Sequence, residues 1–172
     1  MEIRNKRFET GEETPVVTTI VMQCISFYLG DQLYALGMDH VESILFARRI
    51  FLLPNTHDKL LGVYNLRGEI IPVYSLRRIL SLPDVYQGKR IIDDDDRYVI
   101  VVKYQRNILG LMVDSIYKHL EVAESEYQGG DHIAKWSQHA LISGVILKEE
   151  NEILFIDMDK VVSYLSSLNE KG

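Results

Sequence analysis

The side chains that could perform chemistry are few, and they are scattered along the 172 residues of the chain. Five histidines occur, and only His132 and His139 lie close together. Their spacing of seven differs from the i, i+4 pair that holds zinc on one face of a helix. The run Asp93–Asp96 supplies carboxylates, but it lacks the glycine and the distal glutamate of an EF-hand calcium loop. We therefore expect solvated polar side chains at these positions and no metal ion.

Nucleophilic chemistry has no better support. Cys24 is the single cysteine, so the chain can form neither an internal disulfide nor a multi-cysteine zinc site. It lies in a predicted strand, where we expect a buried and inert thiol. No Gly-x-Ser-x-Gly elbow occurs, and Gly129-Gly130 is not followed by the Lys-Ser or Lys-Thr of a phosphate-binding loop. Asp114 follows an apolar run, where we expect its carboxylate to accept from nearby backbone N–H groups, so the residues predict no enzyme and no cofactor.

The overall charge narrows the classes of partner. With 19 Lys and Arg against 25 Asp and Glu, the net charge is −6. Nucleic-acid binding needs a basic surface, and the basic clusters here do not exceed the pairs Arg48-Arg49 and Arg77-Arg78. The first twenty residues lack the apolar core of a signal peptide, and no apolar run is long enough to cross a bilayer. We expect a cytosolic, soluble protein that binds neither nucleic acid nor a membrane directly.

Short β-prone runs separated by turn residues dominate the rest of the sequence. They predict hairpins with turns at 30–31, 67–68, 105–107 and 149–151. Ser75 precedes an i, i+3, i+4 apolar pattern that predicts a short helix, and Asp157 or Asp159 precedes a predicted C-terminal helix. Residues 1–19 are polar and without periodicity, which predicts a flexible arm, and residues 83–96 have the composition of a linker or long exposed loop.

The two halves of the chain resemble one another. A Gly-Val pair opens a hairpin in each half, and Gly62 and Gly144 lie 82 positions apart. Short strands without βαβ alternation predict small antiparallel barrels. We therefore expect a mainly β fold of two barrels, the first over about 20–90 and the second over about 91–172. Barrels of this size bury little core alone, so we expect a shared apolar interface, with the C-terminal helix packing across it.

The second predicted hairpin carries the most specific pattern. Residues Gly62–Val73 read Gly-Val-Tyr-Asn-Leu-Arg-Gly-Glu-Ile-Ile-Pro-Val, and Leu76-Arg77 follow shortly after. This stretch resembles the signature of the CheW family, Gly-x-x-Asn-Leu-Arg-Gly-x-x-(Ile/Val)-Pro-(Ile/Val) followed by Asp-Leu-Arg. The opening hairpin, Val41-x-x-Ile44 and Gly110–Asp114 also match patterns of that family. The resemblance spans about residues 24–165.

The resemblance implies a fold, a function and a set of contact residues. The implied fold is two SH3-like five-stranded antiparallel barrels. The implied function is a cytoplasmic adaptor in chemotaxis signal transduction, which joins the regulatory domain of a CheA-type histidine kinase to the tips of methyl-accepting chemotaxis receptors. Val41, Gly62 and Arg67 match family positions that are linked to receptor coupling. The full set of implied protein-binding residues is Val41, Gly62, Asn65, Leu66, Arg67 and Gly68.

Two departures from the family pattern bear on the choice of partner. Ser43 stands in place of the glutamate of Val-x-Glu-Ile, so a charged contact is lost or moved to Glu42. Ser75 stands in place of the aspartate of Asp-Leu-Arg, and since serine caps a helix about as well as aspartate, the fold should persist. Two alternatives stay open at this point. One is a CheW-like scaffold of another pathway such as twitching motility, and the other is an enzyme whose site is not recognisable.

Overall fold

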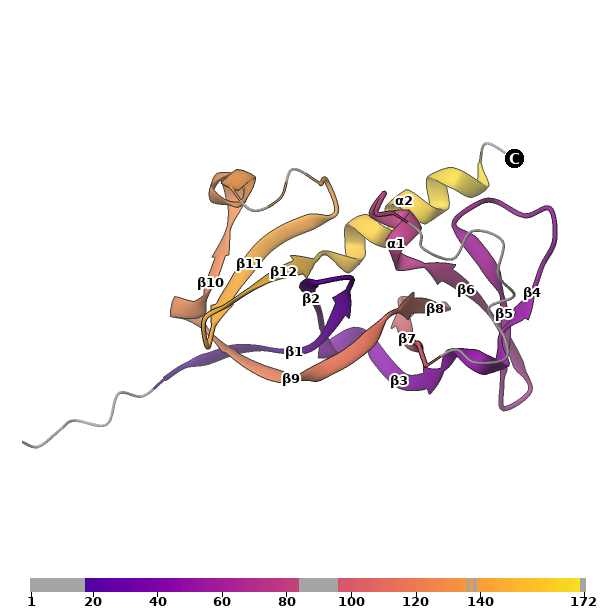
Figure 1. The fold of residues 1–172 in the computed structure, drawn as a ribbon, viewed down its shortest axis with the longest axis horizontal. Coiled ribbons are helices and arrows are strands. Elements are labelled where there is room, and N and C mark those ends of the chain that lie inside the picture. Colours follow the sequence, from indigo (N-terminus) through magenta and orange to yellow (C-terminus); the bar gives the residue numbers. More distant parts are fainter. Residues whose placement is uncertain (1–17, 84–95, 136, 138, 171–172) are drawn as a thin grey trace, which may run out of the picture.

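The computed structural model describes residues 18–83, 96–135, 137 and 139–170. Over these residues the chain is mainly β, and a C-terminal helix lies across the top of the molecule in the view of Figure 1. The expected mainly β fold with short helices, one of them C-terminal, is confirmed. The predicted arm (1–19) and linker (83–96) fall almost wholly outside the described residues, as do Asp93–Asp95 of the aspartate run.

The strands of the described part form two six-stranded sheets. Sheet A contains β1 (Ile20–Leu29), β2 (Gln32–Gly37), β9 (Ser115–Ala123), β10 (Tyr127–Gly129), β11 (Ile142–Lys148) and β12 (Asn151–Ile156). Sheet B contains β3 (Val41–Phe46), β4 (Phe51–Leu52), β5 (Leu60–Leu66), β6 (Glu69–Ser75), β7 (Tyr98–Tyr104) and β8 (Asn107–Val113). The strand orders are β10-β11-β12-β2-β1-β9 and β3-β7-β8-β6-β5-β4.

Helices are short and follow the predicted caps. The α-helices are α1 (Leu76–Ile79) and α2 (Met158–Asn169), and the 3₁₀ helices are η1 (Met38–His40), η2 (Ala47–Arg49), η3 (Glu124–Glu126) and η4 (Gly130–Lys135). The Ser75 hydroxyl accepts from the Arg78 N–H at 3.3 Å, and the Asp157 carboxylate accepts from the Lys160 N–H at 3.3 Å. Each cap satisfies a backbone donor that the first turn of a helix leaves unpaired, so the sequence predicts both starts correctly. The four predicted hairpins are confirmed as well.

Each sheet takes one hairpin from the opposite half of the chain. The hairpin β1–β2 pairs with β9 and, in parallel, with β12, while the hairpin β7–β8 pairs with β3 and, in parallel, with β6. The predicted division of the barrels into residues 20–90 and 91–172 is therefore wrong, because each sheet draws strands from both ranges. The exchange is reciprocal. Read from β9, sheet A has the order β9-β1-β2-β12-β11-β10, and read from β3, sheet B has the order β3-β7-β8-β6-β5-β4. Each strand of one sheet therefore has its equivalent six strands away along the chain. The internal duplication is thus confirmed.

A single turn of 3₁₀ helix joins the two edges of each sheet. Between β9 and β10, the edge strands of sheet A, lies only η3, and between β3 and β4, the edge strands of sheet B, lie η2 and Ile50. So short a connection brings the edges together, and each sheet must curl into a barrel. Each barrel has six strands instead of the five expected, and its shortest are β4 and β10, with two and three residues.

The largest hydrophobic cluster lies between the barrels. It joins side chains of β1 and β2, such as Phe27 and Leu36, to side chains of β7 and β8, such as Ile100 and Leu111. We call it the shared cluster. Both α-helices contribute to it, and α2 does so with Met158, Val161 and Leu165. The expected shared interface is therefore confirmed, and α2 lies over both barrels (Figure 1).

The central strands are buried on both faces. Along β7, Val99 and Val101 point into the core of sheet B, while Ile100 and Val102 point into the shared cluster. Side chains of a strand alternate between its two faces, so a strand between two cores must be apolar at every position. This explains the continuous apolar run at the start of β7.

Cys24 lies fully buried in the core of sheet A, as the sequence predicts. Its burial, and to a smaller extent the Asp39 carboxylate, raises the pKa of the thiol from 9.0 to about 12. At pH 8 the thiolate is therefore about one part in ten thousand. We expect iodoacetamide to leave the native protein unmodified at pH 8 and to alkylate it fully in denaturant, as intact-mass spectrometry would show. Rapid alkylation of the folded protein would contradict this burial.

Candidate protein-binding site

The tip of the β5–β6 hairpin presents Arg67 to solvent. Arg67 and Gly68 form the turn with φ values of 54° and 89°, both in the left-handed region. Glycine adopts this conformation without steric cost. The Asn65 side-chain oxygen accepts from the Gly68 N–H at 2.9 Å and closes the turn, while Leu66 packs against the core of sheet B. The Asn-Leu-Arg-Gly sequence thus builds an anchored turn with an exposed guanidinium at its tip.

Gly62 is buried because β4 passes directly over it. A β-carbon at this position would lie 2.1 Å from the Phe51 carbonyl oxygen and 3.0 Å from the Leu52 α-carbon. Both neighbours are backbone atoms of β4, which pairs with β5 at this point. The repeat places Gly144 at the equivalent position of β11, where a β-carbon would meet the Tyr127 ring of β10. Glycine therefore lets the edge strand of each barrel approach closely.

Val41 packs against a different hydrophobic cluster from the β5–β6 hairpin. Val41 begins β3, pairs with Val102 of β7 and packs against the shared cluster. The hairpin tip instead borders the core of sheet B through Leu66. The six residues implied by the sequence therefore form two groups, with Val41 alone in one and Gly62, Asn65, Leu66, Arg67 and Gly68 along the β5–β6 hairpin in the other.

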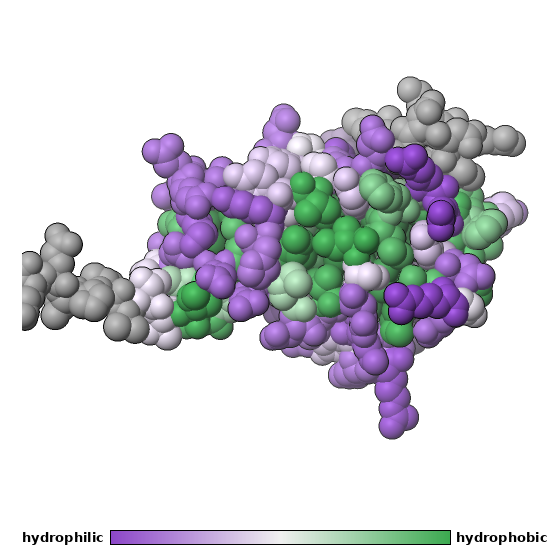
Figure 2. Space-filling view, turned by 90° about the horizontal axis from the view of Figure 1, so that it is seen from below, coloured by the Kyte–Doolittle hydropathy of each residue, from purple (hydrophilic) through white to green (hydrophobic). Residues whose placement is uncertain are grey.

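Exposed hydrophobic side chains lie on three strands of sheet B, β3, β4 and β6, and just after β4. The two most exposed are Phe51, at 66%, and Ile70, at 59%. The set, which we call the apolar face, consists of Ile44, Phe46, Phe51, Leu52, Leu53 and Ile70. Figure 2 shows hydrophobic side chains gathered in the middle of one side of the molecule, with hydrophilic ones around them. Such exposed apolar surface is typical of a protein contact.

Aromatic contacts fix the part of the apolar face at the end of β3. The rings of Phe46 and Tyr98 lie 5.2 Å apart between centroids, and the Arg48 guanidinium lies 5.2 Å from the centroid of the Phe46 ring. A cation held against an aromatic ring keeps its charge at the surface while its stem covers apolar area. Sequence reasoning missed Phe46, because alternating apolar residues in a short strand predict core packing equally well.

Arg77 and Asp114 tie helix α1 to the β1–β2 turn. Arg77 Nε donates to the two Asp114 carboxylate oxygens at 2.8 and 3.1 Å, its Nη2 forms a further ion pair, and the Gly30 N–H donates to Asp114 Oδ2 at 2.6 Å. Partial burial by itself raises the pKa of Asp114, but the hydrogen bonds from Arg77 and Gly30 outweigh it and hold that pKa below its ordinary value. The expectation that Asp114 accepts from backbone donors is confirmed, and Arg77 is the partner that the sequence did not reveal.

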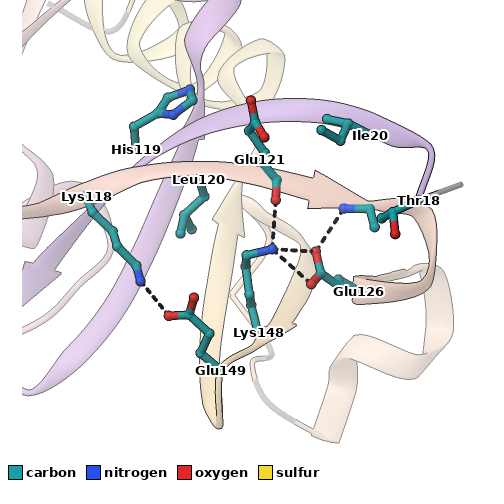
Figure 3. A pocket seen from close by; sticks show the side chains of 10 residues that line it. Thr18, Ile20, Lys118, His119, Leu120, Glu121, Glu126, Lys148 and Glu149 are labelled. Atoms are coloured by element: carbon teal, nitrogen blue, oxygen red, sulfur yellow. Dashed lines mark hydrogen bonds and ion pairs between the residues drawn. The ribbon is translucent and has the colours of Figure 1, made fainter. Parts of the chain in front are cut away.

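The charged hollow at the other end of the molecule holds ion pairs. This hollow of about 510 Å³ lies between β9 and the β11–β12 turn, and Figure 3 shows the side chains that line it. Lys148 donates to both carboxylate oxygens of Glu126, at 2.9 and 3.0 Å, and Lys118 pairs with Glu149. A hydrogen bond from the Ala123 N–H and the bonds from Lys148 lower the pKa of Glu126. The charges thus hold η3, β9 and the β11–β12 turn together.

Within residues 18–83, 96–135, 137 and 139–170, no three His, Cys, Asp or Glu side chains stand close enough together to bind a metal ion. In the same part of the chain, no helix has the length and apolar character needed to traverse a bilayer.

Comparison with known proteins decides the family. The model of the CheW-like domain matches residues 23–166. The chain belongs to the CheW family. The resemblance seen in the sequence is therefore confirmed, and the CheW-like region covers both barrels and most of α2.

Relatives of this CheW-family chain are similar over most of their length. The chemotaxis protein CheW of Bacillus subtilis (strain 168) is 31% identical over 144 residues, which are 83% of this chain and 88% of the relative. The chemotaxis protein CheW of Treponema pallidum (strain Nichols) is 23% identical over 144 residues, 82% of each chain. The crystal structure of the scaffolding protein TtCheW from Thermoanaerobacter tengcongensis aligns with a TM-score of 0.65 and 25% identity, over 79% of this chain and 88% of that one.

Proposed function

We propose that this CheW-family protein is a cytoplasmic adaptor that couples a CheA-type histidine kinase to the tips of chemoreceptors. The observation that carries the proposal is the combination, on sheet B, of the apolar face with the anchored Arg67 turn. Relatives named chemotaxis proteins and a structural neighbour named a scaffolding protein support it. The adaptor works by binding alone, without a cofactor or a catalytic step.

The Arg67 turn is suited to recognising a receptor tip. A guanidinium can bind a carboxylate or carbonyl through two parallel hydrogen bonds, and the turn beneath Arg67 is already closed by Asn65 and Gly68. Little conformational freedom of the backbone is therefore lost on binding. Ile70, which pairs across the hairpin with Asn65, supplies apolar area beside the charge.

Gly62 and Val41 act on this contact in different ways. Gly62 is buried, so it acts through the position of β4, which carries Phe51 of the apolar face. Val41 is partly buried against the shared cluster, so it borders the junction of the barrels. Each contact alone is small and weak, and many receptors and kinases in one assembly would supply the strength through avidity.

We expect Arg67→Glu to weaken receptor coupling about tenfold, because it removes the donor and places a carboxylate in its stead. The measurement is kinase autophosphorylation with purified receptor fragment, kinase and a titration of this protein, which gives the concentration for half-maximal activation. Arg67 is exposed and at a turn, so the melting temperature should change little.

Lys160→Glu is the matched control for Arg67→Glu. It also reverses one exposed positive charge, but on α2, whereas Arg106 lies at the same end of sheet B as Arg67 because β6 and β8 are parallel neighbours. The control should activate the kinase as the wild type does. Equal activation curves for Arg67→Glu and the wild type would refute the role assigned to the β5–β6 tip.

A further inference from the structure

The turn that leads into β11 is closed by a histidine ring. His139 Nδ1 accepts a hydrogen bond from the Leu141 N–H at 3.2 Å, and the His139 carbonyl accepts from the Ile142 N–H at 3.0 Å. The Ser137 hydroxyl accepts from the His139 N–H at 3.2 Å. We call residues 139–142 the His139 turn. The ring accepts from the backbone N–H two residues ahead, as an asparagine side chain does in an Asx turn.

The His139 turn is bonded directly to the start of α2. The Leu141 carbonyl accepts from the Asp157 N–H at 3.0 Å. Asp157 is the N-cap of α2, and its carboxylate accepts from the Lys160 N–H. The side chains of Leu141 and Met158 are buried in the shared cluster. A chain of hydrogen bonds therefore runs from the His139 ring to the helix that lies over both barrels (Figure 1).

A proton on the ring removes the first bond of this chain. Nδ1 accepts only while it carries no hydrogen, and a protonated imidazole has a hydrogen on both nitrogens. The Leu141 N–H would then point at another donor. A backbone donor without an acceptor in a half-buried place is costly, so Leu141 must move away from the ring. Its carbonyl, which holds the Asp157 N–H, moves with it.

The surroundings of the ring favour its neutral form. His139 is half-buried, and this burial lowers its pKa below the ordinary value of 6.5. In the part of the chain that the structure describes, no carboxylate is ion-paired with the ring. The carboxylates of Asp157 and Asp159 are engaged elsewhere, with the Lys160 N–H and the Tyr104 hydroxyl. The titratable groups on the elements beside the turn are Tyr127 of β10, Asp131, His132 and Lys135 of η4, and Asp157, Asp159 and Lys160 at the start of α2.

We propose that the His139 turn is a pH-dependent switch, which holds Leu141 and the start of α2 in place while the ring is neutral and releases them when it is protonated. The unfolded chain binds this proton more readily than the folded one, because the pKa of His139 is lowered on folding. The stabilising contribution is therefore complete well above pH 6.5 and is lost as the pH falls through the lowered pKa.

His57 makes the same bond in a different setting. Its Nδ1 accepts from the Lys59 N–H at 3.1 Å, again two residues ahead, but the ring is exposed. The same nitrogen lies 3.1 Å from Asp58 Oδ1. A proton on this nitrogen can be donated to the Asp58 carboxylate, so the turn at His57 tolerates it. The two histidines thus separate the effect of burial from that of the turn itself.

Amide hydrogen exchange of the purified full chain, followed by NMR, tests the proposal. Protection factors remove the intrinsic effect of pH on exchange and report the opening of each N–H group. We expect the protection of the Leu141 and Asp157 N–H groups to fall about five- to tenfold between pH 7.5 and 5.5, which corresponds to the loss of one hydrogen bond.

Two substitutions at His139 separate the proton from the hydrogen bond. His139→Asn keeps an acceptor for the Leu141 N–H and does not titrate in this range, so the protection should be nearly the same at both pH values. His139→Ala removes the acceptor, so its protection at pH 7.5 should already be as low as that of the wild type at pH 5.5. His57→Asn is the matched control, and it should show the same fall as the wild type.

Three results would overturn the proposal. The first is wild-type protection that does not change between the two pH values. The second is a fall in His139→Asn as large as in the wild type, and the third is His139→Ala protected at pH 7.5 as well as the wild type. The measurement contains neither kinase nor receptor, so its outcome is independent of the proposed function.

Discussion

Gly62→Ala is expected to lower the free energy of unfolding by about 3 kcal/mol or more, at the upper end of overpacking effects. The added β-carbon would lie 2.1 Å from the Phe51 carbonyl oxygen and 2.8 Å from its carbonyl carbon. These are backbone atoms, so no change of side-chain rotamer can relieve the contact and β4 must move away from β5. For a protein of this size, the melting temperature should fall by about 6–12 °C, as measured by differential scanning calorimetry.

Two other glycines provide matched controls for Gly62→Ala. The three atoms nearest to a β-carbon at Gly144, the equivalent position of the repeat, belong to the side chain of Tyr127 and not to backbone, so Gly144→Ala should cost less. Gly37 has open space around it and a φ of −63°, so Gly37→Ala should be neutral or slightly stabilising. If all three variants melt within a degree of the wild type, β4 does not lie over β5 as described.

Asp114→Ala is expected to lower the free energy of unfolding by about 2–3 kcal/mol at pH 7. The substitution removes the acceptor of both the Gly30 N–H and the Arg77 guanidinium, and Arg77 is only 12% exposed. Urea unfolding followed by circular dichroism gives the value. Arg77→Ala should cost a similar amount, and the double variant should cost at least about 1 kcal/mol less than the sum of the two. Strictly additive costs would show that the two side chains do not interact.

The same ion pair makes stability depend on pH in a defined direction. The pKa of Asp114 is lower in the folded state than its ordinary value of 3.8, so the unfolded chain binds the proton more readily. The contribution of Asp114 is therefore complete well above pH 3.8 and is lost as the pH falls through the lowered pKa. The difference in stability between the wild type and Asp114→Ala should be constant from pH 7 to 5 and shrink below pH 4.

The sequence predicts the local elements of this fold because their causes are local. The turns at 30–31 and 67–68 contain glycine at positive φ, and the capping side chains of Ser75 and Asp157 precede helices that begin one residue later. Which hairpin joins which sheet has no local cause. It depends on the parallel pairing of β2 with β12 and of β6 with β8, and neither pairing leaves a pattern within a single strand.

Part of the candidate site can be predicted from the sequence, again because its cause is local. The Asn65–Gly68 turn is a contiguous motif, so its members are found together and the structure keeps them together. Val41 joins that group only by resemblance, and the structure places it on the shared cluster instead. Phe46 and Phe51 are missed, because a strand pattern shows that alternate residues share a face but not which face is covered. Which face of a strand is covered depends on how sheet B curls into a barrel.

Assembly of a complex from three purified components tests the central claim most directly. The regulatory domain of a CheA-type kinase and a receptor cytoplasmic fragment are run through a gel-filtration column with and without this protein. We predict that the two elute together only in its presence, in a complex that contains all three, and that Arg67→Glu retains the kinase domain but carries less of the receptor fragment than the wild type does. Elution of each component at its own volume, at concentrations well above those of the coupled assay, would contradict the account.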